Sequence, residues 1–205
     1  KIAVLGTGSI GSRHIHVLSS IAGVTPIAIP VRPERVSELR ATGIETASDL
    51  HEAAENGARL CIIATDTGRH AQDCIAAIHA GYDILVEKPL SFDSLTAQEV
   101  RQNASDNGCR LYVACVLRFS ESLNAFRSHL REVGEVHSVR IECQSYLPDW
   151  IPSRDYRSTF RSRRTEGGVL LDLVHEIDYA TWIFGWPGSV SARLRNLGQI
   201  GRAHV

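Results

Sequence analysis

The stretch Ile2-Ala3-Val4-Leu5-Gly6-Thr7-Gly8-Ser9-Ile10-Gly11 joins a short apolar run to a G-x-G-x-x-G motif, and the amphipathic residues 10–21 overlap and follow it. Between a strand and a helix, such glycines allow a tight turn, a close approach of the backbone to a pyrophosphate, and close packing of the helix on the strand. The helix N-terminus adds free N–H groups and the positive end of its dipole. We therefore expect a dinucleotide site, with a purely structural glycine turn as the alternative. The residues expected to bind the cofactor here are Gly6, Gly8, Ser9, Ile10 and Gly11.

Apolar runs and amphipathic segments alternate along the first half of the chain. The apolar runs cover residues 2–5, 26–29, 60–64, 84–86 and 111–114. Between them, apolar residues recur at helical spacing in residues 10–21, 33–41, 50–56, 70–80 and 94–106. This alternation predicts parallel strands joined by right-handed crossovers, which is an α/β fold with a doubly wound parallel sheet of the Rossmann type.

The pattern changes after about residue 116. A helical segment at 121–131 precedes an alternating strand at 136–143, and a long helix over 168–184 is followed by a last short strand at 190–194. We therefore divide the chain into a dinucleotide-binding domain, 1–117, and a partial α/β domain for substrate binding and oligomerisation, 118–199. Residues 200–205 match one reading frame of a common sequencing adapter, so we interpret them as an artefactual tail.

The composition is that of an ordinary globular protein, since 43% of the 205 residues are hydrophobic and 22% are charged. The 22 Lys and Arg against 23 Asp and Glu argue against nucleic acid or an anionic membrane surface as a partner. No apolar stretch approaches the roughly 20 residues that cross a bilayer, and no charged leader opens the sequence, so we expect a cytoplasmic protein. The five cysteines form no C-x-x-C pair, which argues against a disulfide framework and a zinc site. We expect no bound metal.

The end of the second apolar run bears on the cofactor preference. An NAD-selective site usually carries an acid about 20 residues after the glycine motif, where it binds the ribose 2′-hydroxyl. The nearest position here is Pro30, and Arg32 follows two residues later. An arginine there can bind a 2′-phosphate. We therefore expect NADP(H), with Arg32 as the phosphate ligand; NAD(H) with a solvated Arg32 is the alternative.

Lysine is rare in this chain, whose only lysines are Lys1 and Lys88. Lys88 follows the apolar run 84–86 directly after Glu87. Ligands of an open parallel sheet bind beyond the carboxyl ends of its strands. Lysine can lose its proton where its pKa is lowered, whereas arginine effectively cannot. We therefore expect Glu87 and Lys88 at the cofactor edge, with Lys88 in a functional role; an exposed lysine in a turn is the alternative.

Acid–base chemistry is expected from the helix at 168–184. Hydride transfer to or from a carbinol carbon also requires a group that takes up or delivers the proton of the oxygen. Asp172, His175 and Asp178 follow each other at intervals of three, which in a continuous helix places His175 between two carboxylates on adjacent parts of one face. A neighbouring carboxylate can orient an imidazole and raise its pKa. A histidine that only packs in the helix is the alternative.

Four motifs together resemble the glucose-fructose oxidoreductase, inositol dehydrogenase and MocA family. They are the glycine motif, residues 64–70 (ATDTGRH), residues 87–89 (EKP) and residues 167–178 (GGVLLDLVHEID), and the resemblance extends to about residue 196. It implies that Lys88 binds the substrate hydroxyl and the nicotinamide ribose, and that His175 is the acid–base catalyst supported by Asp172. It also places Thr65 and His70 beside the cofactor. One departure concerns Asp172, which lies three residues before His175 where the family pattern has four.

The resemblance implies an NAD(P)-dependent oxidoreductase that transfers a hydride between the nicotinamide and a hydroxyl or ketone of a sugar, cyclitol or nucleotide-sugar. Weaker similarities point to surface-polysaccharide sugar synthesis. The second domain would carry an open mixed or antiparallel sheet, here incomplete at its C-terminus, and the full-length protein would form a homo-oligomer. Two alternatives stay open: an NAD(P)-binding regulator without turnover, and an inactive truncated fragment of the enzyme.

Overall fold

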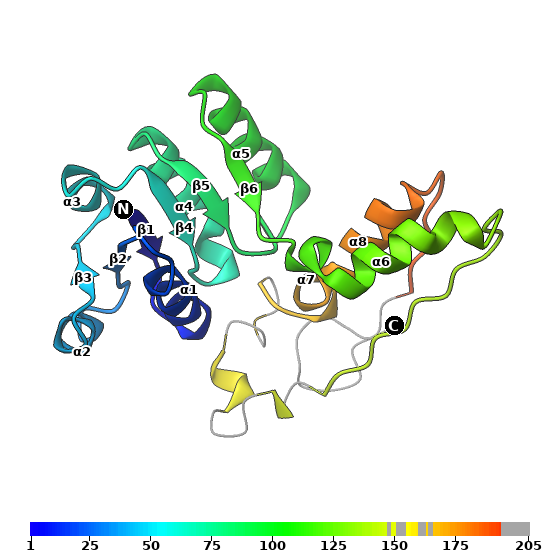
Figure 1. Cartoon of the computed structure of the whole chain (residues 1–205), viewed down its shortest axis with the longest axis horizontal. Coiled ribbons are helices and arrows are strands. Elements are labelled where there is room, and N and C mark those ends of the chain that lie inside the picture. Colours follow the sequence, from blue (N-terminus) through cyan, green and yellow to red (C-terminus); the bar gives the residue numbers. More distant parts are fainter. Residues whose placement is uncertain (147–148, 151–154, 160–162, 164–165, 194–205) are drawn as a thin grey trace. The chain divides into compact units, whose positions relative to one another are not determined.

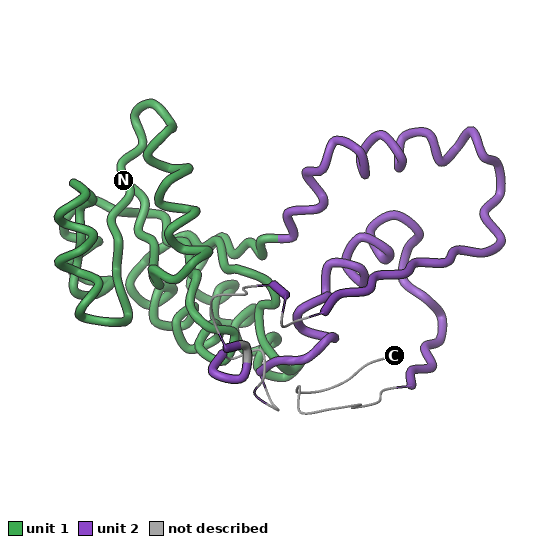
Figure 2. The backbone as a smooth tube through the Cα atoms, turned by 90° about the horizontal axis from the view of Figure 1, so that it is seen from below, with its two compact units in different colours: residues 1–114 green, residues 115–205 purple. Residues whose placement is uncertain are grey.

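The chain divides into two compact units, residues 1–114 and 115–205 (Figure 2). The computed structural model describes residues 1–146, 149–150, 155–159, 163 and 166–193. The predicted domain boundary after residue 117 falls inside the 3-10 helix η1 (Val116–Phe119), just beyond this division, and stays a prediction.

The first unit is built on a six-stranded sheet with the order β3-β2-β1-β4-β5-β6, in which every neighbouring pair is parallel (Figure 1). The strands are β1 (Ile2–Leu5), β2 (Pro26–Ile29), β3 (Glu45–Thr46), β4 (Leu60–Ile63), β5 (Asp83–Val86) and β6 (Leu111–Val113). The helices are α1 (Ser9–Ser19), α2 (Arg35–Ala41), α3 (Leu50–Glu55), α4 (Thr67–His79) and α5 (Ser94–Asp106). The strand order reverses between β1 and β4, so the predicted doubly wound α/β fold is confirmed.

Alternate strand residues point to opposite faces of the sheet and form two separate cores. On one face, residues such as Leu5, Ile63 and Val86 form a cluster with buried side chains of α3, α4 and α5. On the other face, Val4 and Ile62 form a smaller cluster with side chains of α1 and α2. Because helices cover both faces, the central strands consist of continuous apolar runs, the pattern from which they were predicted.

The carboxyl ends of the strands lie in register. Leu5 pairs with Ile29 on one side and Ile63 on the other, and Ile63 pairs in turn with Val86. The residues that follow these strands therefore share one edge of the sheet. This register brings together the glycine motif after β1, the turn after β2, the loop after β4 and the Glu87-Lys88 pair after β5.

The second unit contains helices in its described residues and no strand. They are η1, α6 (Glu121–His129), η2 (Leu130–Glu132), η4 (Tyr156–Ser158), α7 (Val169–Asp172) and α8 (Val174–Phe184). The mixed or antiparallel sheet expected of this domain is therefore not found in the part of it that the structure describes.

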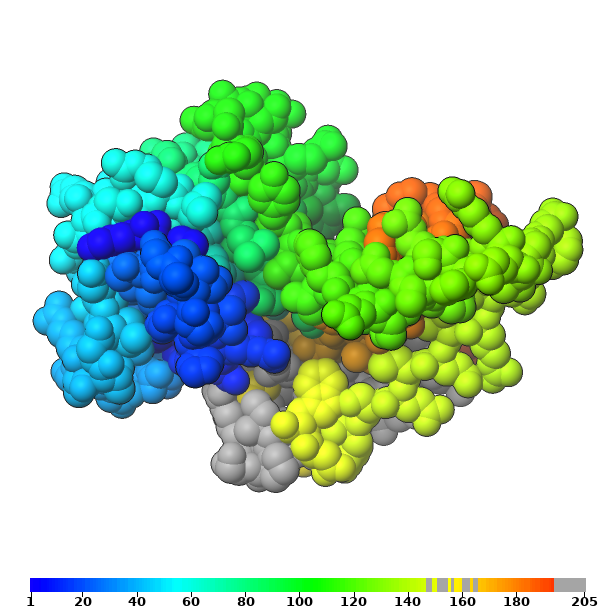
Figure 3. Space-filling view, in the orientation of Figure 1, coloured from blue at the N-terminus to red at the C-terminus, as the bar shows by residue number. Residues whose placement is uncertain are grey.

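The strand predicted at 136–143 is wrong. This segment is irregular and mostly exposed, and its chain runs along the surface in yellow-green (Figure 3). A strand needs a neighbour to accept and donate its ladder hydrogen bonds, and none is present in the described residues of this unit. Residues 190–193 also form no strand, whereas Leu194 and the predicted tail 200–205 lie outside the described residues.

The single helix predicted over 168–184 is also wrong, because it is divided into α7 and α8. Leu173 lies between them with φ −100° and ψ 29°, outside the helical range. Asp172 therefore ends α7 while His175 lies in the first turn of α8, so the intervals of three do not place them on one continuous helix face. His175 and Asp178 do share α8.

Candidate cofactor-binding and catalytic site

The glycine motif forms a tight turn against the loop that follows β4. Gly6 has φ 91°, and a Cβ added to it would lie 2.7 Å from the Ala64 carbonyl oxygen. A Cβ on Gly11 would lie only 1.9 Å from the carbonyl oxygen of Gly6. A Cβ on Gly8 would meet nothing within 4 Å. Gly6 and Gly11 thus allow close backbone packing, whereas Gly8 leaves open space in front of α1.

The N-terminus of α1 suits an anionic ligand. Its N-cap is Gly8, which supplies no side-chain hydrogen bond, whereas the carboxylates of Asp49 and Asp93 accept hydrogen bonds from backbone N–H groups of α3 and α5. No acidic residue lies in the first turn of α1. The free N–H groups of that turn and the open space at Gly8 fit a pyrophosphate. The expected residues Ser9 and Ile10 form the first turn itself.

Two arginines follow β2, and they lie differently. Arg32 is exposed in the turn before α2. The first residue of α2, Arg35, extends back to the glycine motif, where its Nη2 donates to the Thr7 carbonyl at 3.4 Å. Its Nη1 donates to Glu38 at 2.5 Å, and its Nε is buried without a hydrogen-bond partner among the described residues. Sequence reasoning missed Arg35, although it lies only three residues after Arg32.

The loop after β4 is held by α4. The Thr65 hydroxyl donates to Asp73 Oδ2 at 2.7 Å, and Asp73 also forms an ion pair with Arg69 at 3.0 Å. The His70 side chain is only 2% exposed, and its two ring nitrogens lie next to backbone carbonyls. Contact of Thr65 and His70 with the cofactor stays a prediction, and the burial of His70 favours a supporting role for its ring.

The residues after β5 are tied to α1. Oε1 of Glu87 lies 2.8 Å from Nε2 of His14, and both side chains are largely buried. The Glu87 amide donates to the Ile63 carbonyl, which continues the ladder between β4 and β5. Lys88 is half-buried and is joined to Pro89 by a cis peptide bond. The contact between Glu87 and His14, which lies in the second turn of α1, was not predicted from the sequence.

In the second unit, Asp178 on α8 interacts with both Arg118 and Cys115. Nη2 of Arg118 donates to Oδ1 of Asp178 at 2.6 Å, and Nε of Arg118 donates to Oδ2 at 3.1 Å. Burial acts to raise the pKa of Asp178, but hydrogen bonds from Arg118 and Cys115 and the charges of Arg118 and His175 outweigh it, so the pKa lies below its ordinary value. Burial, followed by the charge of Asp178, raises the pKa of Cys115 to about 11. Asp178, which shares α8 with His175, is therefore already engaged by Arg118.

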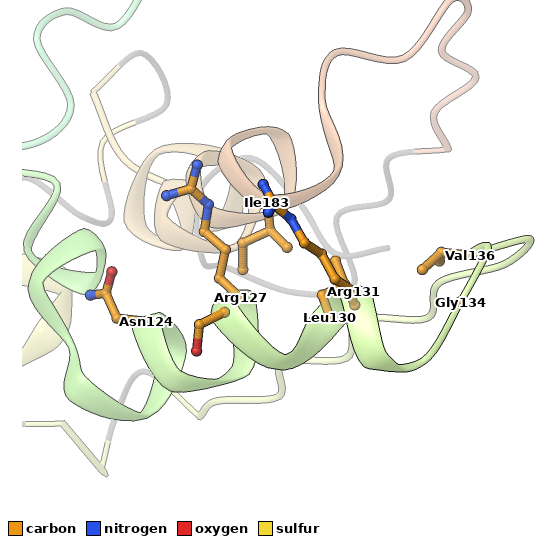
Figure 4. A pocket seen from close by; sticks show the side chains of 8 residues that line it. Asn124, Arg127, Leu130, Arg131, Gly134, Val136 and Ile183 are labelled. Atoms are coloured by element: carbon orange, nitrogen blue, oxygen red, sulfur yellow. The ribbon is translucent and has the colours of Figure 1, made fainter.

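A surface hollow of about 720 Å³ lies in the second unit beside α6 (Figure 4). Its lining comprises Asn124, Arg127, Ser128, Leu130, Arg131, Gly134, Val136 and Ile183. The Arg127 guanidinium lies 4.6 Å from the centre of the Trp182 ring. None of the predicted site residues lines this hollow, so it plays no part in the site built from the sequence.

Two further features are absent from the described residues. None of their helices has the length and apolar character required to cross a membrane. Within the same residues, no three or more His, Cys, Asp or Glu side chains are grouped so that they could hold a metal ion.

Comparison with known proteins identifies the family. Residues 1–115 match the model of an oxidoreductase family with an NAD-binding Rossmann fold, and residues 129–202 match the GFO/IDH/MocA C-terminal domain. The chain belongs to the Gfo/Idh/MocA oxidoreductase family. The resemblance inferred from its motifs is thereby confirmed.

Relatives in this family are longer than the chain. Myo-inositol 2-dehydrogenase of Thermotoga maritima is 28% identical over 192 residues, which are 90% of this chain and 55% of that protein. The 4-carboxy-2-hydroxymuconate-6-semialdehyde dehydrogenase of a Sphingobium species is 29% identical over 72% of this chain and 48% of its own length. The chain thus spans about half the length of these two relatives.

Solved structures of the same fold carry either form of the cofactor. Biliverdin reductase of Synechocystis, determined with biliverdin and NADP+, has a TM-score of 0.75 at 20% identity and is matched over 95% of this chain and 61% of its own. Scyllo-inositol dehydrogenase of Lactobacillus casei, determined with NAD(H) and scyllo-inositol, has a TM-score of 0.71 at 18% identity, over 89% of this chain and 55% of its own. At this identity the likeness shows the fold.

Proposed function

We propose that the protein is an NAD(P)-dependent oxidoreductase that transfers a hydride between the nicotinamide ring and a carbinol or carbonyl carbon of a sugar or cyclitol. The carrying observation is the register that aligns the ends of β1, β4 and β5 at one edge, where Gly6, Ala64 and Glu87 follow them. That edge of a doubly wound sheet is where dinucleotides bind. Family membership and the inositol dehydrogenases among the relatives support the same reaction class.

The first unit would hold the cofactor. The N–H groups of the first turn of α1 would bind the pyrophosphate across the open space at Gly8. Arg32 and Arg35 would bind a ribose 2′-phosphate, and on this ground we propose NADP(H) as the preferred cofactor. When bound, the nicotinamide supplies the hydride acceptor or donor of the reaction.

Two side chains would act on the substrate oxygen. The Lys88 ammonium would donate hydrogen bonds to the reacting oxygen and the nicotinamide ribose. His175 would take the hydroxyl proton when the substrate is oxidised and return it when the substrate is reduced. Asp172 would orient His175 from α7. Lys88 belongs to the first unit and His175 to the second.

The proposed substrate is a small polyhydroxylated molecule: a free sugar, a cyclitol or the sugar of a nucleotide-sugar, as in surface-polysaccharide synthesis. A cytoplasmic location and a homo-oligomeric full-length protein complete the proposal. The relatives named as inositol dehydrogenases make myo-inositol and scyllo-inositol the first compounds to assay.

The first test is a titration of nicotinamide fluorescence with NADPH and, separately, NADH. Saturable binding with a preference for NADPH is expected, and it should be followed by measurement of NADP+ reduction with a panel of cyclitols and sugars. The variant Lys88→Met should bind cofactor and lose turnover. Cofactor binding without turnover of any polyol would contradict the proposed enzyme and favour a nucleotide-binding regulator. If neither dinucleotide binds, the proposed cofactor site is contradicted as well.

A further inference from the structure

The His70 ring lies between two loops of the cofactor edge. Its Nδ1 is 2.7 Å from the carbonyl oxygen of Pro89, in the turn after β5. Its Nε2 is 3.0 Å from the carbonyl oxygen of Thr65, in the loop after β4. The residue is only 2% exposed. A single buried imidazole thus faces an acceptor with each of its nitrogens.

A neutral imidazole cannot satisfy both contacts. It carries one N–H donor and one nitrogen lone pair, whereas a backbone carbonyl oxygen only accepts. In either neutral tautomer, one ring nitrogen would direct a lone pair at a carbonyl oxygen no more than 3.0 Å away. The imidazolium donates from both nitrogens and satisfies both carbonyls.

We propose that His70 is a positioning residue that acts as a buried imidazolium. Nδ1–H donates to Pro89 and Nε2–H donates to Thr65, so that one cation joins the loop after β4 to the turn that contains Lys88. Loss of either ring proton would leave one of the two loops without its donor. The position of Lys88 therefore depends on the protonation of His70.

Three charged groups on the surrounding elements, Arg69, Asp73 and Glu87, have partners other than the ring. On α4, Asp73 forms its ion pair with Arg69 and accepts from the Thr65 hydroxyl. After β5, Glu87 faces His14. The ring is therefore held by its two carbonyl acceptors. The titratable or charged groups of the two loops and of α4 nearest in sequence to its contacts are Asp66, Arg69, Asp73, Glu87 and Lys88.

A doubly protonated His70 can be distinguished from a histidine that only packs in the core, because both of its ring nitrogens carry a proton. Triple-resonance assignment and a long-range proton–nitrogen spectrum of the nitrogen-15-labelled protein report the protonation of each histidine nitrogen. At neutral pH we expect both nitrogens of His70 to be protonated, with slowly exchanging N–H signals. The exposed His51 serves as the reference histidine in the same spectra. A single neutral tautomer at His70 would overturn the proposal.

The effect on Lys88 can be measured without any enzymatic activity, because Lys1 is the only other lysine of the chain. Reductive methylation with carbon-13 formaldehyde gives each lysine its own methyl signal. In the folded variant His70→Gln, which cannot donate from both ends of its side chain, we expect the Lys88 signal to shift and the Lys1 signal to stay in place. The control variant His51→Gln should leave both signals unchanged. An unchanged Lys88 signal in folded His70→Gln would contradict the positioning role.

The relevance of this residue to catalysis rests on the proposed function, and the two can fail separately. If the reaction is as proposed, His70→Gln should lower kcat at least tenfold while changing the Kd of NADPH by less than about threefold, since the phosphate-binding end is untouched. A doubly protonated His70 in a protein without turnover would refute the function and leave the positioning role intact. A neutral His70 in an active enzyme would refute the positioning role and leave the proposed function intact.

Discussion

Nε2 of His14 lies 2.8 Å from Oε1 of Glu87, so the helix that begins at the glycine motif is joined to the residue that precedes Lys88. The side chains are only 22% and 13% exposed. The contact spans the edge of the sheet from β1 to β5 across β4. The two ends of the proposed cofactor site, phosphate and nicotinamide, are therefore held by one side-chain pair.

Removing this pair should destabilise the first unit. His14→Ala leaves the Glu87 carboxylate without its ring donor in a largely buried place, and we expect the free energy of unfolding to fall by about 1–3 kcal/mol. Glu87→Ala should have a similar cost, and the double variant should cost less than the sum. Urea unfolding of the four proteins measures the coupling. The exposed His16→Ala on the same helix serves as control, and strictly additive single changes would mean that the contact is absent in solution.

Substitutions at two glycines of the motif should have different effects, one on stability and the other on NADPH binding. Gly11→Ala places a methyl group 1.9 Å from the Gly6 carbonyl oxygen, so we expect a loss of about 3 kcal/mol in stability. Gly8→Ala meets nothing within 4 Å and should keep the melting temperature, while its methyl group occupies the space proposed for the pyrophosphate. The measurements are thermal melts and NADPH titrations of both variants. Tight NADPH binding by Gly8→Ala would show that the pyrophosphate does not bind in the space at Gly8.

The parallel sheet could be predicted from the sequence because it is buried on both faces. Its central strands are continuous apolar runs, and the helices between them carry one apolar side each. The edge strand β3 has only two residues, Glu45 and Thr46, and neither is apolar, so no local pattern marked it. The alternation at 136–143 predicted a strand, but strand formation depends on a neighbouring strand that local sequence cannot supply.

Candidate site residues could be named from the sequence where the chemistry is local, and not where it depends on distant partners. The glycine motif and Lys88 stand out by spacing and by rarity. The contacts of Arg35 with Thr7 and of Arg118 with Asp178 join residues 28 and 60 positions apart, which spacing does not reveal. The break at Leu173 involves neither glycine nor proline, so the helix there looked continuous.

Cofactor preference should depend on Arg35 at least as much as on Arg32. Arg35 lies against the glycine motif, so its guanidinium is already placed at the cofactor edge. Loss of a charge-assisted contact of about 1.5–3 kcal/mol corresponds to roughly a 10- to 150-fold rise in the Kd of NADPH for Arg35→Ala. The Kd of NADH should stay nearly constant. Exposed Arg101→Ala is the control; equal losses for NADPH and NADH would show that Arg35 supports the loop and does not read the 2′-phosphate.

The Arg118–Asp178 pair should give the second unit a distinct dependence on acid. Because the folded-state pKa of Asp178 is lowered, its contribution to stability is complete above the ordinary value of 3.8 and is lost as the pH falls through the lower folded value. In Arg118→Leu the hydrogen bonds and the charge of Arg118, which lower the pKa of Asp178, are removed, so acidification should cost the variant less stability than it costs the wild type. The stability difference between wild type and Arg118→Leu should therefore be largest above about pH 4 and shrink below it. Urea unfolding, followed by the fluorescence of the tryptophans, measures this difference across the pH range. When Asp178→Asn is added to both proteins, the stability difference between them should no longer vary with pH. In the original pair, a difference that grows with acid would contradict the assigned pairing.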